Sequence, residues 1–323
     1  MKIFPIFIPQ QGCKFQCIYC NQFNITGVDK IDWEITSQQL ANFTQKNSGF
    51  DKEIAFFGGT FTAISIETRE LYYSKVRAFV GERTTLRYST RPDAITNELL
   101  DEGLRESVTT IELGVQSLSN SVLSQSGRGY SKQQVFLACK MIKERGFKLG
   151  VQLMPGLPGF TEESFNETIQ GVISIDPDFV RIYPLLVLED TPLTKLYNEN
   201  LYTPLSLEDA IKYSSDMLEE FEINGIKVIK IGLHSDIDVR GGVIAGPFHP
   251  NFGELVMGEV LIRGILGAVD FDCHLAVSNK NISLLKGNKR YTLKQLEERC
   301  DYNILSVSVD KNLSAGKFII TKP

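Results

Sequence analysis

The sequence lacks several features that would assign it to a specialised class of protein. No run of eighteen apolar residues occurs in its 323 residues, so no membrane-spanning helix is expected. The opening MKIFPIFIPQ lacks the continuous apolar segment and small-residue cleavage site of a secretory signal, and it favours a first strand instead. With 42% hydrophobic and 23% charged residues, the composition is that of an ordinary globular protein.

The sequence also has little excess positive charge and few cysteines. Its formal net charge of −5 gives no general attraction to nucleic acid. Six unevenly spaced cysteines do not make a disulfide scaffold in a chain of this length, so a reducing cytoplasm is the expected location. One local exception to the acidic balance is segment 279–290, NKNISLLKGNKR, which is expected to be a solvated loop face. Its basic residues are Lys280, Lys286, Lys289 and Arg290.

What the sequence does contain is an alternation of apolar strand-like runs with amphipathic helical stretches. The strand-like runs span residues 3–8, 53–57, 84–90, 109–115, 147–154, 178–186 and 226–232. Such an alternation is typical of a parallel sheet covered by helices. We therefore expect an α/β fold: a partial (β/α)6-type barrel of parallel strands in residues 1–240, with its chemistry at the carboxyl ends of the strands.

The character of the chain changes after about residue 240. Segment 239–253, VRGGVIAGPFHPNFG, is rich in glycine and proline and is expected to form an ordered loop at the mouth of the barrel. A helix is expected at 254–266, and the remainder reads as strand, helix, strand and strand. Residues 241–323 are therefore interpreted as a substrate loop followed by a small C-terminal α/β extension.

Three cysteines, Cys13, Cys17 and Cys20, lie within eight residues in the loop expected after the first strand. A structural zinc site normally has four protein ligands, and none of the three histidines lies nearby in sequence. Three thiolates on a 4Fe–4S cluster would leave one iron with an open position for a substrate or cofactor. A zinc site completed from afar, or three buried structural thiols, remains the alternative.

The CxxxCxΦC pattern, in which Tyr19 is the aromatic residue, resembles the signature of radical S-adenosylmethionine (SAM) enzymes. The segments FFGGTFT, STRPDAI, IELGVQSLSNSVLSQSGRG, GVQLMPGLPGFTEE and VRIYPLLVLEDTPL occur in the order found in one branch of that family. That branch holds the Elongator catalytic subunit and oxygen-independent coproporphyrinogen III oxidase. The resemblance covers residues 5–255 and is strongest to short bacterial proteins that carry GPFHP, here residues 246–250.

Two departures from that branch accompany the resemblance. The chain has no room for the acetyltransferase domain of the Elongator subunit, and Gln152 stands where the porphyrin enzyme usually has an aspartate. The resemblance implies that SAM binds the open iron of a single 4Fe–4S cluster. One electron then cleaves SAM to a 5′-deoxyadenosyl radical, which abstracts hydrogen from the substrate. A flavodoxin or ferredoxin would supply the electron.

The resemblance also implies which residues bind SAM. Gly58, Gly59 and Thr60 would receive the SAM ammonium, because glycine lets backbone groups approach closely. Arg128 would pair with the carboxylate through its planar fork, and Arg91 would point into the same cavity. The remaining expected cofactor-binding residues are Tyr19, Glu112, Gln116, Gln152 and Gly156. Salt bridges, helix caps, plain turns or core filling would explain the same residues without a cofactor.

The substrate residues are expected after the later strands. His249 and Glu254 are the catalytic candidates, because their loop joins glycine, proline and two phenylalanines at the expected mouth. The substrate-binding candidates are Tyr183, His234, Phe248 and Phe252. These groups suit a small planar heterocycle, as in a queuine-releasing lyase of nucleoside salvage. A tRNA-modifying enzyme is the alternative and is disfavoured by the acidic charge. A non-catalytic iron–sulfur or zinc module is the third hypothesis.

Overall fold

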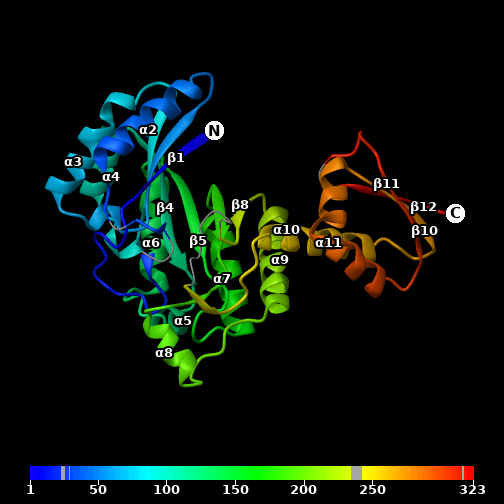
Figure 1. Cartoon of the computed structure of the whole chain (residues 1–323). Helices are drawn as coiled ribbons and strands as arrows, with labels where there is room; N and C mark the ends of the chain where they lie inside the picture. Colours follow the sequence, from blue (N-terminus) through cyan, green and yellow to red (C-terminus); the bar gives the residue numbers. More distant parts are fainter. Residues whose placement is uncertain (23–25, 29, 234–241, 315) are drawn as a thin grey trace.

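The centre of the protein is a seven-stranded parallel sheet that curls into a partial barrel (Figure 1). The computed structural model describes residues 1–323 except 23–25, 29, 234–241 and 315. The strands lie in the order β1-β2-β3-β4-β5-β6-β8, and all six pairings between neighbours are parallel. Their bounds are β1 (Lys2–Phe7), β2 (Lys52–Phe57), β3 (Thr84–Thr90), β4 (Val108–Gln116), β5 (Lys148–Leu153), β6 (Phe179–Ile182) and β8 (Lys227–Ile231). The predicted α/β partial barrel is confirmed, with one strand more than a six-stranded type.

Helices alternate with the strands, and most of them cover the outer face of the sheet (Figure 1). The two short helices at Asn120–Gln125 and Pro192–Asn198 instead lie at the strand ends and pack around Cys17 and Tyr19. The helices are α2 (Trp33–Lys46), α3 (Ile66–Val76), α4 (Asn97–Arg105), α5 (Asn120–Gln125), α6 (Lys132–Glu144), α7 (Glu162–Ile175), α8 (Pro192–Asn198) and α9 (Leu207–Ile223). Short 3-10 turns occur at Phe61–Ala63, Arg77–Phe79 and Pro92–Ala94. Side chains fix where the helices begin: Ser131 and Gln134 form a capping box on α6, and Thr161 and Ser164 form one on α7.

The main hydrophobic core lies between the sheet and this helical layer. Aromatic rings fill its N-terminal half, where Phe61 stacks on Tyr88 with ring centroids 4.9 Å apart and also contacts Phe56 at 4.8 Å. Aliphatic side chains of β4, β5 and β6, such as Ile111 and Leu149, are fully buried against α6 and α7. The core therefore holds the strand ends in a fixed arrangement at the mouth of the barrel.

A short antiparallel ribbon crosses the barrel mouth. It pairs β7 (Val187–Leu188), which follows β6, with β9 (Val243–Ala245), a short strand inside the segment 239–253 that was expected to be a loop. Helix α10 (Phe252–Leu266) then packs on α9 through a small cluster that includes Phe252, Leu255 and Leu218. Among the described residues, no helix combines the length and apolar character needed to cross a bilayer.

The C-terminal elements form a smaller unit of two layers, a sheet and the helices that cover it, and this unit lies apart from the barrel (Figure 1). A three-stranded sheet has the order β11-β10-β12, built from β10 (Cys273–Val277), β11 (Ile304–Val309) and β12 (Phe318–Thr321). Helix α11 (Asn279–Arg299) and the second half of α10 cover one face through Leu261, Ile265, Leu285, Leu293 and Leu296. The expected order of strand, helix, strand and strand is confirmed.

The expectation of a loop at 279–290 was wrong, because this segment is the first half of α11. Ser278 caps the helix by accepting from the N–H of Asn281 at 3.1 Å. The apolar residues of the segment alternate with basic ones at a spacing that buries Leu285 and leaves Lys286 exposed. The basic side chains therefore lie on a helix rather than on a loop.

Candidate active site at the cysteine loop

The three clustered cysteines lie in the loop that leaves β1 at its carboxyl end. Cys13 is exposed, Cys17 is buried and Cys20 is half-buried, and all three are free thiols. The loop is fixed to the rest of the barrel through its backbone, since the N–H of Ile18 donates to the carbonyl of Ser126 at 3.3 Å. The thiols therefore sit at the active end of the barrel, where the resemblance to radical SAM enzymes places a cluster.

The GGT turn after β2 packs directly against the cysteine loop. A Cβ on Gly59 would lie 2.6 Å from the carbonyl oxygen of Ile8, and Gly58 has a φ of +92°, so neither position accepts a larger residue without strain. The hydroxyl of Thr60 lies 3.2 Å from the sulfur of Cys13. The turn thus brings a polar side chain to the first cysteine, and at Gly59 its backbone approaches the cysteine loop closely.

Arg128 is the central cation of the site. Its Nη1 donates to the sulfur of Cys17 at 2.9 Å and to the hydroxyl of Tyr19 at 3.1 Å. Its Nε donates to the hydroxyl of Tyr130 at 2.8 Å, and its Nη2 donates to the carbonyl of Gly114. The whole side chain is buried. These four hydrogen bonds use four of the five guanidinium N–H groups, so a carboxylate could bind Arg128 through two N–H groups only by displacing a partner.

Arg91 forms a second guanidinium beside the same thiol. Its Nη1 lies 3.6 Å from the sulfur of Cys17, and its Nε donates to Asp93 at 2.9 Å. The guanidinium lies over the rings of Phe15 and Tyr130, at 5.1 Å and 5.2 Å from their centroids. Arg91 therefore links the end of β3 to the cysteine loop, and Asp93 compensates part of its charge.

The protonation states in this cluster follow from burial and from these cations. Burial raises the pKa of Tyr19, although the charge of Arg128 opposes the shift. Burial would lower the pKa of Arg128, but the neighbouring Tyr130, Tyr19 and Cys17 raise it, so the guanidinium stays charged. Burial raises the pKa of the Cys20 thiol to about 11. The free protein therefore holds Cys20 as a neutral thiol that must lose its proton to bind a metal.

Gln116 and Gln152 meet at the carboxyl ends of β4 and β5. The Nε2 of Gln152 lies 3.5 Å from the Oε1 of Gln116, at the limit of a hydrogen bond. Gln116 has a φ of +69°, at an irregularity in the pairing with β5. A Cβ on Gly114 would lie 3.0 Å from the Gln116 amide and 3.3 Å from the Arg128 guanidinium. The two glutamines predicted to contact SAM are thus side by side, and Gln116 lies next to Arg128.

Gly156 lies in the PGLPG turn after β5. Its φ is +90°, a conformation that disfavours other residues, and a Cβ would lie 3.0 Å from Leu205. Its carbonyl accepts from the hydroxyl of Tyr202 at 2.6 Å. That acceptor is therefore already engaged by the chain itself.

Glu112 and Tyr183 belong to a buried ionic network inside the barrel. The carboxylate of Glu112 accepts from Arg87 at 2.6 Å and pairs with Arg181 at 3.0 Å. Arg87 also contacts Glu53, and Arg181 donates to the hydroxyl of Tyr183 at 3.1 Å. Two carboxylates and two guanidinium groups balance their charges in this layer. Glu112 is thus engaged by arginines of the same sheet.

The sequence reasoning did not single out Arg87, Arg181 or Tyr130. The first two have a readable signal, because each interrupts an apolar strand of a sheet that is buried on both faces. Tyr130 follows directly after the SGRG segment that supplied Arg128. Only the fold shows that its ring contacts both Arg91 and Arg128.

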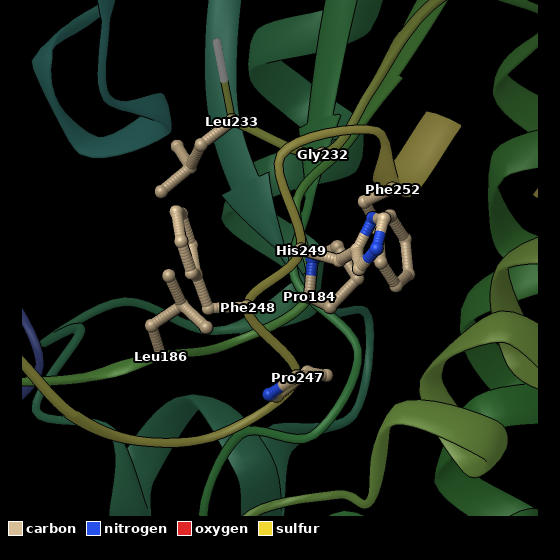
Figure 2. Close-up of a pocket in the computed structure, with 8 residues that line it drawn as sticks. All are labelled: Pro184, Leu186, Gly232, Leu233, Pro247, Phe248, His249 and Phe252. Atoms are coloured by element: carbon tan, nitrogen blue, oxygen red, sulfur yellow. The ribbon is translucent and has the colours of Figure 1, made fainter. Parts of the chain in front are cut away.

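The predicted substrate loop lines a small pocket, about 20 Å³ in volume, that is partly open to solvent (Figure 2). Phe248, His249 and Phe252 all contribute to it, and Figure 2 shows Phe248 directed toward Leu186 and Leu233. The other lining residues are Pro184, Gly232 and Pro247. The ring of His249 also accepts from the N–H of Asn251 through Nδ1 at 3.1 Å, which leaves Nε2 for another partner.

Two of the candidates, Glu254 and Tyr183, do not line this pocket. Glu254 lies in the first turn of α10 and is exposed to solvent. His234 lies outside the described residues. Tyr183, two residues before Leu185, points into the ionic network, where burial raises its pKa. The structure therefore brings together Phe248, His249 and Phe252.

The substrate loop that lines this pocket is linked to the cysteine loop through a shared hydrophobic cluster. Tyr19 and Cys17 share a buried cluster with Leu185 and Val187, and Ala245 of β9 packs against that cluster. The next residue, Gly246, begins the GPFHP segment. The β7–β9 ribbon thus spans from the cysteine thiols to the loop that carries His249. A partial β/α barrel with clustered thiols, buried arginines and an adjacent pocket defines a metallocofactor enzyme.

Comparison with known proteins agrees with this class. Residues 7–172 match the radical SAM superfamily, and residues 177–261 match the radical SAM C-terminal domain. The chain therefore belongs to the radical SAM superfamily. It is a radical SAM enzyme, and the cofactors of this superfamily are a 4Fe–4S cluster and SAM.

Three proteins illustrate the relationship. The chain is 30% identical over 239 residues to a tRNA uridine(34) acetyltransferase of Methanocaldococcus infernus, which covers 66% of this chain and 43% of the relative. The solved archaeal M. infernus Elp3 superposes with a TM-score of 0.65 at 23% identity, over 81% of this chain and 63% of that one. Coproporphyrinogen III oxidase (HemN) of Escherichia coli superposes with a TM-score of 0.52 at 18% identity, over 69% and 53%. The chain thus spans less than half of the relative that it matches in sequence.

The described residues fit a cluster better than a single metal ion. Each sulfur has a polar group beside it: the hydroxyl of Thr60 at Cys13, the guanidinium of Arg128 at Cys17, and the amide of Gln22 at Cys20 at 3.5 Å. Hydrogen bonds and positive charge at the sulfurs suit the anionic thiolates of an iron–sulfur cluster. Ligands of one tetrahedral zinc would bring the sulfurs within roughly 4 Å of each other. Among the described residues, no three His, Cys, Asp or Glu side chains are placed to hold one metal ion together.

Proposed function

We propose that this chain is a radical SAM enzyme that modifies a base of transfer RNA. The carrying observation is the match to a protein named tRNA uridine(34) acetyltransferase, which is 30% identical over 239 residues and covers 66% of this chain. The archaeal Elp3 likeness in fold supports the same reading. This reverses the order of the two substrate hypotheses drawn from the sequence. The queuine-releasing lyase of nucleoside salvage has no support among the relatives reported above.

The residues of this chain have distinct tasks in the proposed reaction. When bound, the cluster and SAM supply one-electron chemistry that generates a carbon radical. Cys13, Cys17 and Cys20 would hold the cluster, and Arg128 and Arg91 would offset its negative charge. The paired amides of Gln116 and Gln152 would orient SAM beside it. An external flavodoxin or ferredoxin would deliver the electron.

The residues at this pocket suit the base of a nucleotide that lies against its open side. Phe248, which is 43% exposed, offers apolar ring surface on which a planar heterocycle can stack, as unstacked bases do in RNA recognition, whereas Phe252 is buried in the pocket wall. The free Nε2 of His249 can hydrogen-bond the edge of that base. The β7–β9 ribbon keeps this pocket close to the cysteine loop. A single base drawn out of the RNA would therefore reach the cofactor while the rest of the RNA lies outside the barrel.

The test is an anaerobic assay with the reconstituted protein, SAM and dithionite. Added tRNA transcript should raise the release of 5′-deoxyadenosine above the level without substrate, and the same RNA digested to nucleosides should not. Iron analysis should give about four irons per chain by cubane stoichiometry, and Cys17→Ser should abolish both signals. Equal stimulation by digested RNA or by queuosine would return the small-molecule hypothesis to first place. One zinc per chain without iron would overturn the cluster itself.

A further inference from the structure

The charge of the chain is distributed unevenly between the barrel and the C-terminal unit. Residues 268–323 contain nine Lys and Arg and six Asp and Glu, which gives a formal charge of +3. Residues 1–267 contain 25 Lys and Arg and 33 Asp and Glu, which gives −8. The net acidity that argued against RNA is therefore a property of the barrel, whereas the small unit beside it is basic.

Three lysines of this unit lie together at one end of its strands, and we call this end of the sheet the edge. Lys280 is in the first turn of α11, Lys311 follows β11, and Lys317 precedes β12. The register joins these points, because Val277 at the end of β10 pairs with both Val309 and Phe318.

Hydrogen bonds fix the loops that carry these lysines. The N–H of Asp310 donates to the carbonyl of Val277 at 2.9 Å, and the side chain of Asn281 donates to the carbonyl of Lys317 at 3.1 Å. Asn281 is buried and also accepts from the N–H of Gly316 at 3.0 Å. The edge is thus a built arrangement rather than three unrelated surface positions.

The lysines of this edge are available to a partner. Lys280, Lys311 and Lys317 are exposed, and none of them forms an ion pair with another residue in the described part of the chain. One carboxylate, Asp310, lies among them, and its Oδ1 accepts from the N–H of Asn312 at 2.8 Å. Three cations against one engaged carboxylate leave a local positive excess.

The uncovered face of the same sheet continues this surface without acidic side chains. α10 and α11 cover only the opposite face, toward which Leu275 and Val277 point. By strand alternation and register, the uncovered face carries His274, Ala276, Ser306, Ser308, Ile319 and Thr321. Hydroxyl and imidazole groups are suited to hydrogen-bond phosphate and ribose oxygens.

We propose that the edge formed by Lys280, Lys311 and Lys317 binds the phosphate backbone of the tRNA substrate. This inference rests on the proposed function and names the surface that the substrate would use outside the pocket. The unit stands apart from the cysteine loop across the barrel (Figure 1). A contact so far from the cysteine loop serves a large, polyanionic substrate and has no use for a free nucleoside. The acidic barrel would keep RNA from binding unproductively elsewhere.

The experiment compares two triple variants of the full chain. Lys280→Gln/Lys311→Gln/Lys317→Gln removes the edge, and Lys46→Gln/Lys75→Gln/Lys148→Gln removes three exposed lysines near the opposite end of the barrel with the same change in net charge. Binding of a fluorescent tRNA transcript is measured by anisotropy at several salt concentrations. The edge variant should bind roughly tenfold more weakly, and its salt slope should fall by about 2–3, at about 0.9 per phosphate contact. The barrel variant should behave as wild type.

The outcomes separate this inference from the proposed function. Wild-type protein that binds tRNA and releases 5′-deoxyadenosine in response, with an edge variant equal to the barrel variant, overturns the inference alone. Wild-type protein that does not respond to tRNA overturns both. Loss of a dimer in the edge variant, seen by sedimentation, would assign the edge to a second copy instead. Unchanged iron content and circular dichroism in both variants verify that the fold is intact.

Discussion

The guanidinium of Arg128 and the thiol of Cys17 are in direct contact, with Nη1 2.9 Å from the sulfur. Both side chains are buried, and 111 residues separate them in the chain. A permanently charged donor is therefore built onto one ligand of the expected cluster. The same cation is the group that the resemblance assigns to the SAM carboxylate. These two roles make Arg128 the residue whose replacement tests most of the site.

We expect Arg128→Lys to weaken SAM binding although it keeps the charge. Lysine cannot reproduce the planar fork that contacts Cys17, Tyr19 and Tyr130 together. Loss of one charge-assisted hydrogen bond costs about 1.5–3 kcal/mol, or roughly ten- to a hundredfold in affinity. Equilibrium dialysis with labelled SAM measures this. Arg145→Lys, on the surface, is the control, and unchanged affinity in the Arg128 variant would remove it from the SAM site.

A second prediction concerns the potential of the cluster. Arg91→Gln removes a positive charge 3.6 Å from the sulfur of Cys17 and should shift the midpoint potential to more negative values. Asp93→Asn removes the carboxylate that compensates Arg91 and should shift it the other way. Redox titration followed by electron paramagnetic resonance reports both potentials without any substrate. Shifts of the same sign in the two variants would mean that Arg91 acts only through the shape of the loop.

A third prediction uses the acidity of Cys20. Burial raises the pKa of its thiol from 9.0 to about 11, so in the free protein the reactive thiolate forms only as the pH rises toward 11. Alkylation by iodoacetamide at pH 8 should therefore be much slower at Cys20 than at the exposed Cys13. The rate at Cys20 should increase through pH 9–11. Peptide mass spectrometry separates the two sites, and equal rates at pH 8 would contradict the burial of Cys20.

A fourth prediction addresses the ionic network inside the barrel. Glu112→Gln leaves Arg87 and Arg181 without a full counter-charge in a buried layer and should lower the free energy of unfolding by about 3–5 kcal/mol. Glu144→Gln breaks only an exposed pair with Lys140 and should change it little. Urea unfolding of the free protein measures both. Equal stability of the two variants would show that the network is hydrated rather than buried.

The fifth prediction separates the two catalytic candidates. His249→Ala should leave iron content and SAM binding intact but stop substrate-dependent release of 5′-deoxyadenosine, because its ring lines the pocket. Glu254→Ala should have a smaller effect, since its side chain is not among those lining the pocket. The reaction progress of the three proteins with one tRNA transcript provides the comparison. Equal losses in the two variants would place the Glu254 carboxylate at the substrate.

The sequence predicted the barrel well because its signal is local. Each strand-like run from 3–8 to 226–232 contains or overlaps a strand of the sheet, since buried parallel strands are written as continuous apolar runs. The spacing of Cys13, Cys17 and Cys20 is local too, and so is the pattern that led to the family. By contrast, the partners of Arg128 come from the cysteine loop, from the loop that carries Arg128 itself and from the end of β4. No periodic pattern in the sequence predicts that these residues contact one another.

The prediction of a loop at 279–290 in the C-terminal unit was wrong for a related physical reason. Segment 279–290 is basic and contains Gly287 and Asn288, residues that are poor helix formers. Packing of Leu285 against α10 outweighs that preference, and the segment is helical. The net charge of the chain likewise averaged two parts of opposite sign. An average over 323 residues hides where the charge lies.

Helix α10 belongs to both parts of the molecule. Phe252 at its start lines the pocket, whereas Leu261 and Ile265 near its end pack into the C-terminal unit. Its 15 residues span about 22 Å at 1.5 Å per residue. The helix is thus a spacer of fixed length and fixed rotation between pocket and unit. Insertion of one residue in its middle would turn one end by about 100° relative to the other. Such a variant could keep the fold of both parts and yet hold the pocket and the C-terminal unit in the wrong relative position to contact one substrate together.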